Sequence, residues 1–389
     1  MTKITTLQAS ASAPPGHSYA ICTRCVMDTS DPDITFDQQG VCSHCRRYDA
    51  LLPSRVMHGA EGAVALEAIA AKIKNHGRGR DYDCIIGVSG GVDSTYVAYR
   101  VKRLGLRPLA VHLDNGWNSE LAVMNIERVL RRLDIDLYTH VLDWEEFKAL
   151  QIAFLKASTP DGEIPSDHAI QALLWRQAIK HGVRYIISGM NFTTESISVP
   201  AWAYGHSDWR YIRGVYRQFG GGELRSYPHF TFPFLLYVNA VRRVRVVSLL
   251  NYIDYDKSAA MKVLQEELGW RYYGGKHYES IYTRFYQGYI LPVKFGIDKR
   301  VGHLSDLINS GQISRAQALE ELKKPPYPEA LFKTDYDFVL KKLGLDEAGF
   351  QALMKLPSKT FRDYRNSYAL VQFMRNSVNR LRGFGLYPR

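Results

Sequence analysis

Residues 82–94 of this 389-residue chain read YDCIIGVSGGVDS, an apolar run followed by a turn rich in glycine and serine. The apolar, β-branched first half predicts a buried strand over residues 82–88. The pair Gly90-Gly91 predicts a tight turn, and the residues after it predict a helix from Val92 to Leu104. A strand that leads through such a turn into a helix indicates an α/β fold.

The chain downstream continues this alternation of strand and helix. Strands are predicted over residues 109–113, 137–142 and 185–188, and helices over residues 119–133, 144–157 and 169–180. Short links between alternating elements predict a parallel sheet that is covered by helices on both faces. Ligands of such sheets bind beyond the carboxyl ends of the strands.

The turn after the first predicted strand carries the groups that a phosphate site needs. Its backbone N–H groups and the start of the next helix attract anions, and Ser89 and Ser94 add hydroxyl donors. Asp93 offers a carboxylate to a Mg²⁺ ion that bridges phosphate oxygens. The Gly-Lys-Ser/Thr ending of a Walker loop is absent from this turn. A glycine-rich turn without a ligand is the alternative, which the flanking strand and helix disfavour.

Ser89, Gly90, Gly91, Asp93 and Ser94 match Ser-Gly-Gly-x-Asp-Ser, the pyrophosphate loop of the PP-loop ATPases (adenine nucleotide alpha hydrolase-like). The pattern of residues 81–195 resembles these enzymes. The resemblance implies that ATP is cleaved between its α and β phosphates and that a nitrogen or sulfur nucleophile attacks an adenylated substrate. It also implies that Asp114 and Gly189, at the ends of the second and fourth strands, bind the nucleotide. ATP and Mg²⁺ are the expected cofactors.

Two Cys-x-x-Cys pairs near the N-terminus are separated by sixteen residues and consist of Cys22, Cys25, Cys42 and Cys45. This spacing is typical of a structural zinc site with four thiolate ligands. His44 is an alternative ligand, and an iron–sulfur cluster or two disulfides are alternative forms. The lack of a secretory signal argues against disulfides. Cys84, within the first predicted strand, is expected to be a small core residue.

The cysteines also limit the source of the transferred atom. No cysteine follows Cys84 in the chain, so sulfur transfer lacks an evident carrier unless the N-terminal cysteines serve. Residue 2 is threonine, which excludes a glutaminase with an N-terminal cysteine nucleophile, and no cysteine is left for one activated by histidine. Ammonia would therefore come from solution or from a separate glutaminase.

The C-terminal half contains two distinctive stretches, GGKHYES at residues 274–280 and KFGIDKR at residues 294–300. Together with the cysteine pairs and the phosphate loop, they resemble the N-acetyl sugar amidotransferase family, PP-loop enzymes of bacterial surface-polysaccharide biosynthesis. The resemblance spans residues 20–310. It implies conversion of an acetamido group of an N-acetyl sugar nucleotide to an acetamidino group, for lipopolysaccharide O-antigen or a related glycan. It also implies glutaminase-like and cyclase-like partner subunits that supply ammonia.

Five residues of these stretches are candidate catalytic residues, together with Asp93 of the loop. The side chains of Lys294, Lys299 and Arg300 suit the phosphates of ATP or of a sugar nucleotide. His277 and Glu279 suit acid–base catalysis or hydrogen bonds to a sugar. The alternatives are a solvated basic turn for the cations and ordinary polar packing for His277 and Glu279.

The net charge of +11 favours anionic partners. Between residues 210 and 245, seven arginines interleaved with aromatic residues face one acid, Glu223. This composition suits RNA, a nucleotide sugar or an acidic subunit equally, and a basic surface over an aromatic core is the plain alternative. A tRNA-modifying (thiolation) PP-loop enzyme is therefore the second hypothesis. A nucleotide-binding adaptor without activity is disfavoured by the intact loop.

The sequence predicts five regions in a cytoplasmic protein. These are a flexible tail (1–19), a four-cysteine zinc module (20–50), a linker helix (51–80), the PP-loop ATP-binding domain (81–250) and a mostly helical substrate or partner region (251–389). A membrane span is not expected, because the most apolar stretch, residues 230–253, contains three arginines.

Overall fold

The structure, a computed structural model, describes residues 19–275 and 277–373 of the chain. The predicted tail, except residue 19, and the last residues of the predicted C-terminal region lie outside this part. Within it, no helix is long and apolar enough to cross a membrane.

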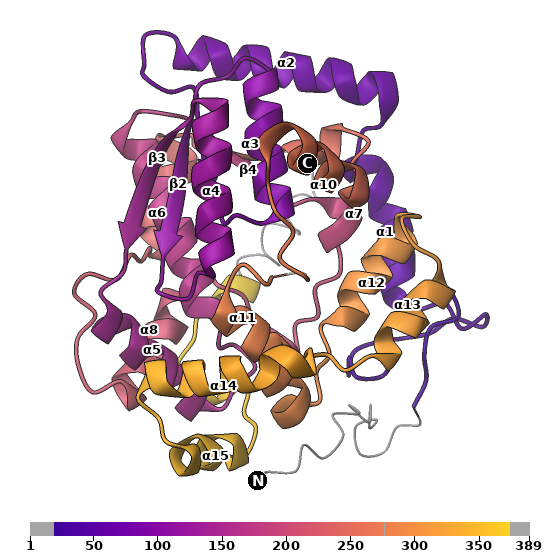
Figure 1. The fold of residues 1–389 in the computed structure, drawn as a ribbon, viewed down its shortest axis with the longest axis vertical. Coiled ribbons are helices and arrows are strands. Elements are labelled where there is room, and N and C mark those ends of the chain that lie inside the picture. Colours follow the sequence, from indigo (N-terminus) through magenta and orange to yellow (C-terminus); the bar gives the residue numbers. More distant parts are fainter. Residues whose placement is uncertain (1–18, 276, 374–389) are drawn as a thin grey trace.

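A five-stranded parallel sheet forms the centre of the molecule and confirms the predicted α/β fold (Figure 1). Its spatial order is β3-β2-β1-β4-β5. The strands β2 and β3 follow β1 on one side, and β4 and β5 lie on the other side of β1. The order therefore reverses between β1 and β4, where ligands of open parallel sheets bind. The strands are β1 (Cys84–Gly87), β2 (Pro108–Asp114), β3 (Asp136–Val141), β4 (Tyr185–Ser188) and β5 (Arg245–Ser248).

The strand β5 was not predicted. It is a short edge strand in which Arg245 and Val246 are exposed, so it lacks the continuous apolar run of a central strand. The four strands that were predicted are all present, with ends that differ by at most two residues from the expected ones.

Neighbouring residues of β1 point to opposite faces of the sheet and join two separate cores. Ile86 packs with the helices α2 (Gly59–Gly77), α3 (Val92–Arg103), α4 (Glu120–Leu133) and α10 (Lys257–Leu268). Ile85 packs with α5 (Trp144–Ala157), α6 (Ile164–Lys180) and α8 (Trp209–Phe219). The helix α6 begins five residues earlier than predicted, because Pro165 fits the first turn of a helix.

The region after residue 250 is mostly helical, as predicted. In Figure 1, α11, α14 and α15 lie beyond the arrowheads of β2 and β3, at the carboxyl edge of the sheet. The helices are α11 (Ile281–Phe285), the π-helix η3 (Tyr286–Phe295), α12 (Arg300–Asn309), α13 (Arg315–Lys323), α14 (Glu329–Leu343) and α15 (Glu347–Lys355). Shorter helical segments are α7 (Phe192–Glu195), α9 (Phe232–Leu236), η1 (Tyr237–Val241), η2 (Leu249–Tyr252) and η4 (Phe361–Asp363).

The N-terminal segment packs beside this C-terminal region. Its helix α1 (Ser43–Arg55) lies next to α12 and α13 in Figure 1. The helix α1 runs across residue 50, where a boundary between module and linker was expected, so the structure has no break at that position.

Candidate functional site

The turn after β1 forms a closed loop at the switch point of the sheet. Ser89 and Ser94 hydroxyl oxygens lie 3.2 Å apart, and the Gly91 N–H donates to the Ser89 hydroxyl over 3.3 Å. The Ser94 hydroxyl donates to the Gly91 carbonyl over 3.2 Å. These contacts hold the loop in shape at the start of α3, where the N–H groups of the first turn attract an anion.

Two glycines are required by the backbone around this loop. Gly90 has a φ of +80°, and a Cβ atom there would lie 2.7 Å from the Ala122 carbonyl oxygen. Gly189, after β4, lies so close to the loop that a Cβ atom would be 3.2 Å from the Ser94 nitrogen. A side chain at either position would push the loop out of place. The predicted residues Ser89, Gly90, Gly91, Asp93, Ser94 and Gly189 are thus brought together at one place.

Three aromatic residues from the region after residue 250 hold this loop. The Trp270 indole N–H donates to the Gly90 carbonyl over 2.9 Å. The Val92 N–H donates to the Tyr273 hydroxyl over 3.3 Å, and the Tyr255 hydroxyl donates to the Asp93 carboxylate. Burial raises the pKa of the Tyr255 hydroxyl, and the Asp93 charge adds to the rise. The Tyr255 hydroxyl therefore remains a donor to Asp93.

Sequence reasoning missed these three residues. They come from a part of the chain without a motif, and aromatic residues there fit a core equally well. The signal that was available was the density of tyrosine and tryptophan around residues 270–273, directly before the distinctive stretch at 274–280.

Glu279 reaches the same loop from the C-terminal side. Its Oε1 atom lies 3.3 Å from the position of a Cβ atom on Gly91, and its Oε2 atom is buried with no hydrogen-bond partner among the described residues. Burial is the largest influence and would raise the pKa of Glu279, but the facing His277 imidazole, 3.7 Å away, together with a backbone hydrogen bond and the charge of Lys257, lowers the pKa overall. Glu279 is therefore an ionised carboxylate beside the loop, and within the described residues its Oε2 atom has no hydrogen-bond partner.

The backbone fixes Glu279 in this position. The Ser119 N–H donates to the Glu279 carbonyl over 2.8 Å, and the Ile281 N–H donates to the Trp117 carbonyl over 2.8 Å. Residues 279–281 therefore pair with the link between β2 and α4, next to the end of β2.

Asp114, at the end of β2, mainly organises its own turn. Its Oδ1 atom accepts hydrogen bonds from the Gly116 N–H over 2.8 Å and from the Asn118 amide over 3.3 Å. The side chain is half-buried, so its Oδ2 atom can face a nucleotide as well. Nucleotide binding by Asp114 stays a prediction.

A second polar group surrounds Lys299. The Lys299 ammonium lies 3.2 Å from Glu163 at the start of α6. The nearby Asp167 side chain is exposed to solvent, although protein surrounds it on most sides. Burial among these neighbours raises the pKa of Asp167, with the charge of Glu163 adding to it and those of His206, Lys299 and His277 opposing it. Lys299 and His277 thus belong to one electrostatic group.

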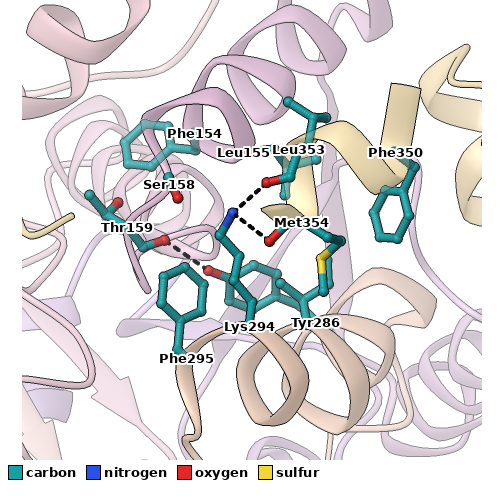
Figure 2. A pocket seen from close by; sticks show the side chains of 11 residues that line it. Phe154, Leu155, Ser158, Thr159, Tyr286, Lys294, Phe295, Phe350, Leu353 and Met354 are labelled. Carbon is teal, nitrogen blue, oxygen red and sulfur yellow. Dashed lines mark hydrogen bonds between the residues drawn. The ribbon is translucent and has the colours of Figure 1, made fainter. Parts of the chain in front are cut away.

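Lys294 and Arg300 lie in other surroundings. The Lys294 ammonium donates to the carbonyls of Leu353 and Met354 at the end of α15, and it borders a small cavity of about 10 Å³ (Figure 2). Burial lowers its pKa. Arg300 forms a fork with Asp298 at 2.7–3.0 Å and donates to the Lys324 carbonyl. Their positive charge suggested phosphate binding. In the structure, the Lys294 ammonium binds carbonyls at the end of α15, and the Arg300 guanidinium binds Asp298 and the Lys324 carbonyl.

The four predicted metal ligands converge. The Sγ atoms of Cys22, Cys25, Cys42 and Cys45 lie within 4.8 Å of one another, and all four residues are fully buried. A zinc ion with four Zn–S bonds of about 2.3 Å separates its sulfurs by about 3.8 Å, so the cluster is compatible with zinc. The Sγ atoms of Cys25 and Cys42 lie 3.7 Å apart and those of Cys22 and Cys45 lie 4.0 Å apart, and all four cysteines are free, which excludes disulfides.

His44, the alternative metal ligand, contacts a different partner in the structure. Its Nε2 atom lies 2.6 Å from the buried Asp31 carboxylate. Cys84 is fully buried in β1, and burial raises the pKa of its thiol, as expected of a core residue.

Contacts from α12 and α13 fix the cysteine cluster. The Arg315 guanidinium donates to the carbonyls of Cys22 and Cys25 over 2.9–3.2 Å. The Val26 N–H donates to the Ser305 hydroxyl over 3.2 Å. The cluster therefore supports the C-terminal region rather than standing apart from it.

Comparison with known protein families finds a match in the C-terminal part of the chain. Residues 279–377 match the family model of the LPS biosynthesis protein WbpG-like, C-terminal domain. The match begins at Glu279 and confirms the family resemblance that the sequence indicated. An uncharacterized protein of Methanocaldococcus jannaschii is 23% identical over 279 residues, which cover 69% of this chain and 81% of that protein.

Three solved structures are similar in part. NMN synthetase from Francisella tularensis has a TM-score of 0.29 and 15% identity, and covers 78% of this chain and 97% of its own. NH3-dependent NAD synthetase from Campylobacter jejuni has a TM-score of 0.29 and 15% identity, with 54% and 85% covered. A predicted subunit of tRNA methyltransferase from Methanocaldococcus jannaschii has a TM-score of 0.28 and 12% identity, with 47% and 74% covered. We assign the fold from the strand order and register given above and not from these similarities.

Proposed function

We propose that this protein is an ATP-dependent, AMP-forming amidotransferase that converts the acetamido group of an N-acetyl sugar nucleotide to an acetamidino group. The observation that carries the proposal is the loop of residues 89–94, set at the switch point of a parallel sheet and contacted by Glu279 of the WbpG-like region. The WbpG-like match supports a role in LPS biosynthesis, and the loop supports the use of ATP.

The proposed reaction activates a poor leaving group. The amide oxygen attacks the α phosphate of ATP and displaces pyrophosphate, which gives an adenylated amide. The nitrogen lone pair of ammonia then forms a bond to the amide carbon. The C–O bond breaks, AMP leaves with the former amide oxygen, and a proton is lost from nitrogen to give the amidine. Atoms balance as amide, ATP and ammonia in, and amidine, AMP and pyrophosphate out.

The loop's part in this reaction is to hold the phosphates. The unpaired N–H groups at the start of α3 and the hydroxyls of Ser89 and Ser94 donate to the pyrophosphate portion, and the Ser94 hydroxyl exchanges its bond to the Gly91 carbonyl for one to phosphate. Asp93, held by Tyr255, and the unpaired Oε2 atom of Glu279 are oxygen ligands of the kind that Mg²⁺ prefers, so these two residues would hold the ion. Mg²⁺ supplies neutralisation of phosphate charge when it is bound.

His277 and Lys299 are proposed to face the sugar and the nitrogen nucleophile. Both act electrostatically on Asp167, which is open to solvent, so this group lies where a polar substrate has access. The proposed role of the cysteine cluster is structural, with zinc as its metal, because four protein ligands leave no coordination position for a substrate.

Oxygen-18 in the acetamido group of the substrate tests the reaction. The label is expected in AMP, since the amide oxygen leaves with the adenylate, and the product is about one mass unit lighter than the unlabelled substrate because NH replaces oxygen. Label that stays in the sugar, or release of ADP and phosphate, would refute the proposal.

Ammonium and glutamine as sole nitrogen donors test the source of ammonia. The isolated chain is expected to use ammonium and not glutamine, because its five cysteines are placed in the cluster and in the core. Glutamine is expected to serve after glutaminase-like and cyclase-like subunits are added. Delivery of ammonia by a partner subunit is useful because it keeps water, which would hydrolyse the adenylate, out of the site. Turnover with glutamine by the chain alone would contradict this, and thiolation of tRNA would support the second hypothesis.

A further inference from the structure

A cavity of about 950 Å³ lies between α8 and residues 365–372, away from the loop of residues 89–94. Four arginines line it, Arg210, Arg213, Arg217 and Arg365, and all four are exposed. Phe232 and Tyr368 contribute aromatic surface to its wall. A volume of this size is that of a small-molecule site rather than a flat protein contact.

The positive charge in this cavity is not balanced by the protein. No ion pair joins any of the four arginine side chains to an acid within the described residues. Asp208 is the one carboxylate among the described lining residues, and it is occupied by the Tyr204 hydroxyl at 2.7 Å and the Ser367 N–H at 2.6 Å. The cavity therefore presents a net positive charge to solvent.

The sequence of α8 places this charge on one face of the helix, where repulsion between like charges lowers the stability of the helix. Arg210, Arg213 and Arg217 have the spacing i, i+3, i+7, which brings like charges together on the helix surface. The Asp208 carboxylate caps the N-terminus of α8 by accepting hydrogen bonds from the N–H groups of Arg210 and Tyr211, and the first turn of the helix contains no further acid.

Gly214, on the same face, lets the fourth arginine approach. A Cβ atom on Gly214 would lie 3.1 Å from the Arg365 carbonyl oxygen. The absence of a side chain there allows the C-terminal segment to pack against α8 and adds a further cation. Such a concentration of unpaired guanidinium groups opposes folding, and a bound anion offsets it.

We propose that this cavity binds the diphosphate group of a ligand whose remaining part is aromatic or apolar. Guanidinium groups match phosphate oxygens with paired hydrogen bonds, which accounts for arginine rather than lysine at all four positions. A nucleoside diphosphate and a polyprenyl diphosphate share this chemistry.

The cavity stands next to the polar group around Lys299. The Tyr204 N–H donates over 2.8 Å to Asp161, two residues before Glu163, the partner of Lys299. A ligand held by its diphosphate here would extend toward Asp167 and His277. That this ligand is the carrier of the acetamido sugar rests on the proposed function, whereas the binding of a diphosphate does not.

Calorimetric titration of the full chain tests the site. The probes are UDP, farnesyl diphosphate and inorganic pyrophosphate, with α,β-methylene-ATP present to fill the phosphate loop. We expect UDP or farnesyl diphosphate to bind one per chain, more tightly than pyrophosphate. Arg213→Ala and Arg217→Ala are each expected to raise the Kd by about tenfold. The matched control is Arg225→Ala, an exposed arginine paired with Glu223 outside the cavity lining, which is expected to leave the Kd unchanged.

The outcomes separate this site from the proposed reaction. Binding of UDP alone identifies a nucleotide carrier, and binding of farnesyl diphosphate alone identifies a lipid carrier. Arginine-dependent binding without AMP release on any acetamido sugar would retain the site and refute the proposed function. Binding that is equal in Arg213→Ala, Arg217→Ala and Arg225→Ala overturns the site. Tighter, arginine-dependent binding of a single-stranded RNA oligomer than of either diphosphate also overturns it.

Discussion

The four-cysteine cluster and the phosphate loop are built in opposite ways. All four thiols of the cluster come from residues 22–45, and the spacing in the sequence already predicts their convergence. The loop of residues 89–94 is also local, but its neighbours come from Tyr255, Trp270, Tyr273 and Glu279. The ligands of the cluster are therefore set by one short segment, although Arg315 and Ser305 contact it from the C-terminal region, whereas the surroundings of the loop are assembled from distant parts of the chain.

Removal of the metal is the largest expected change and tests the independence of the cluster. Metal binding supplies about 10 kcal/mol or more of folding free energy in small zinc domains, so Cys42→Ser is expected to unfold residues 20–50 locally. Zinc content by elemental analysis and hydrogen exchange of this segment measure the effect. The Cys84→Ser variant is the control and should keep one zinc per chain. An iron signal with visible absorbance would identify a different cluster and favour the sulfur-transfer hypothesis.

Asp93→Ala is expected to lower AMP formation at least about a thousandfold, or about 4 kcal/mol of transition-state stabilisation, because phosphate charge loses its metal ligand. Zinc content should not change, since the two sites share no residue. Pulsed measurement of AMP and pyrophosphate gives the rate, and thermal unfolding checks the fold. A decrease of less than tenfold would mean that Asp93 does not hold the metal.

Acid is expected to weaken the packing around α6, where His168 lies. Burial lowers the pKa of His168 to about 4, and its ring lies between Phe230 and Trp209. The unfolded chain, with an ordinary pKa near 6.5, binds this proton first as the pH falls. Stability from His168 is therefore complete above about pH 6.5 and is lost progressively down to pH 4, by about 3 kcal/mol in all.

Denaturant titrations between pH 7 and pH 4 measure this loss. Wild type and His168→Gln should be compared at each pH, since both contain the same cysteine cluster and its own acid dependence cancels in the difference. The variant is expected to show the shallower slope. Equal slopes in the two proteins would exclude His168 as the source.

Tyr273→Phe tests whether distant residues tune the loop. The variant removes the hydroxyl that accepts a hydrogen bond from the Val92 N–H. The loss of one such bond costs about 1 kcal/mol, so the KM for ATP is expected to change by about fivefold. Tyr272→Phe is the matched control, because Tyr272 is the neighbouring residue and is half-exposed. Identical KM values for both variants would show that the loop is set by its own sequence.

Lys294→Met should have the smallest effect on turnover. The structure uses Lys294 at the end of α15, so AMP formation is expected to change by less than about twofold, while stability falls by about 1 kcal/mol. Chemical denaturation and the AMP assay together make the measurement. A large rise in the KM for ATP with unchanged stability would return Lys294 to the phosphate site.

The parts of the fold and site that follow from local pattern were predictable. The strand β4 has the predicted bounds, as does α5, because each consists of one continuous pattern between clear breaks. The cysteine cluster and the phosphate loop have motifs with fixed spacing. The edge strand β5 and the start of α6 were missed, since exposure hides the strand pattern and Pro165 suggests a break where a helix begins.

The composite contacts were not predictable from spacing. Lys294, Lys299 and Arg300 lie within seven residues in the sequence, yet their side chains go to α15, to Glu163 and to Asp298. A π-helix that ends at Phe295 and a turn at Gly296 separate their directions. The partners of such residues are set by tertiary packing, which one stretch of sequence does not contain.

The Arg315 contact to the cysteine cluster has a consequence for synthesis of the protein. The chain completes the cluster at residue 45, but the cation that binds its carbonyls follows 270 residues later. At a synthesis rate of about 5–20 residues per second, the ribosome needs roughly 14–54 s to produce it. During that interval the carbonyls of Cys22 and Cys25 lack the guanidinium that binds them in the folded protein. Metal capture early in translation would therefore protect its thiols from oxidation until the far end of the polypeptide arrives.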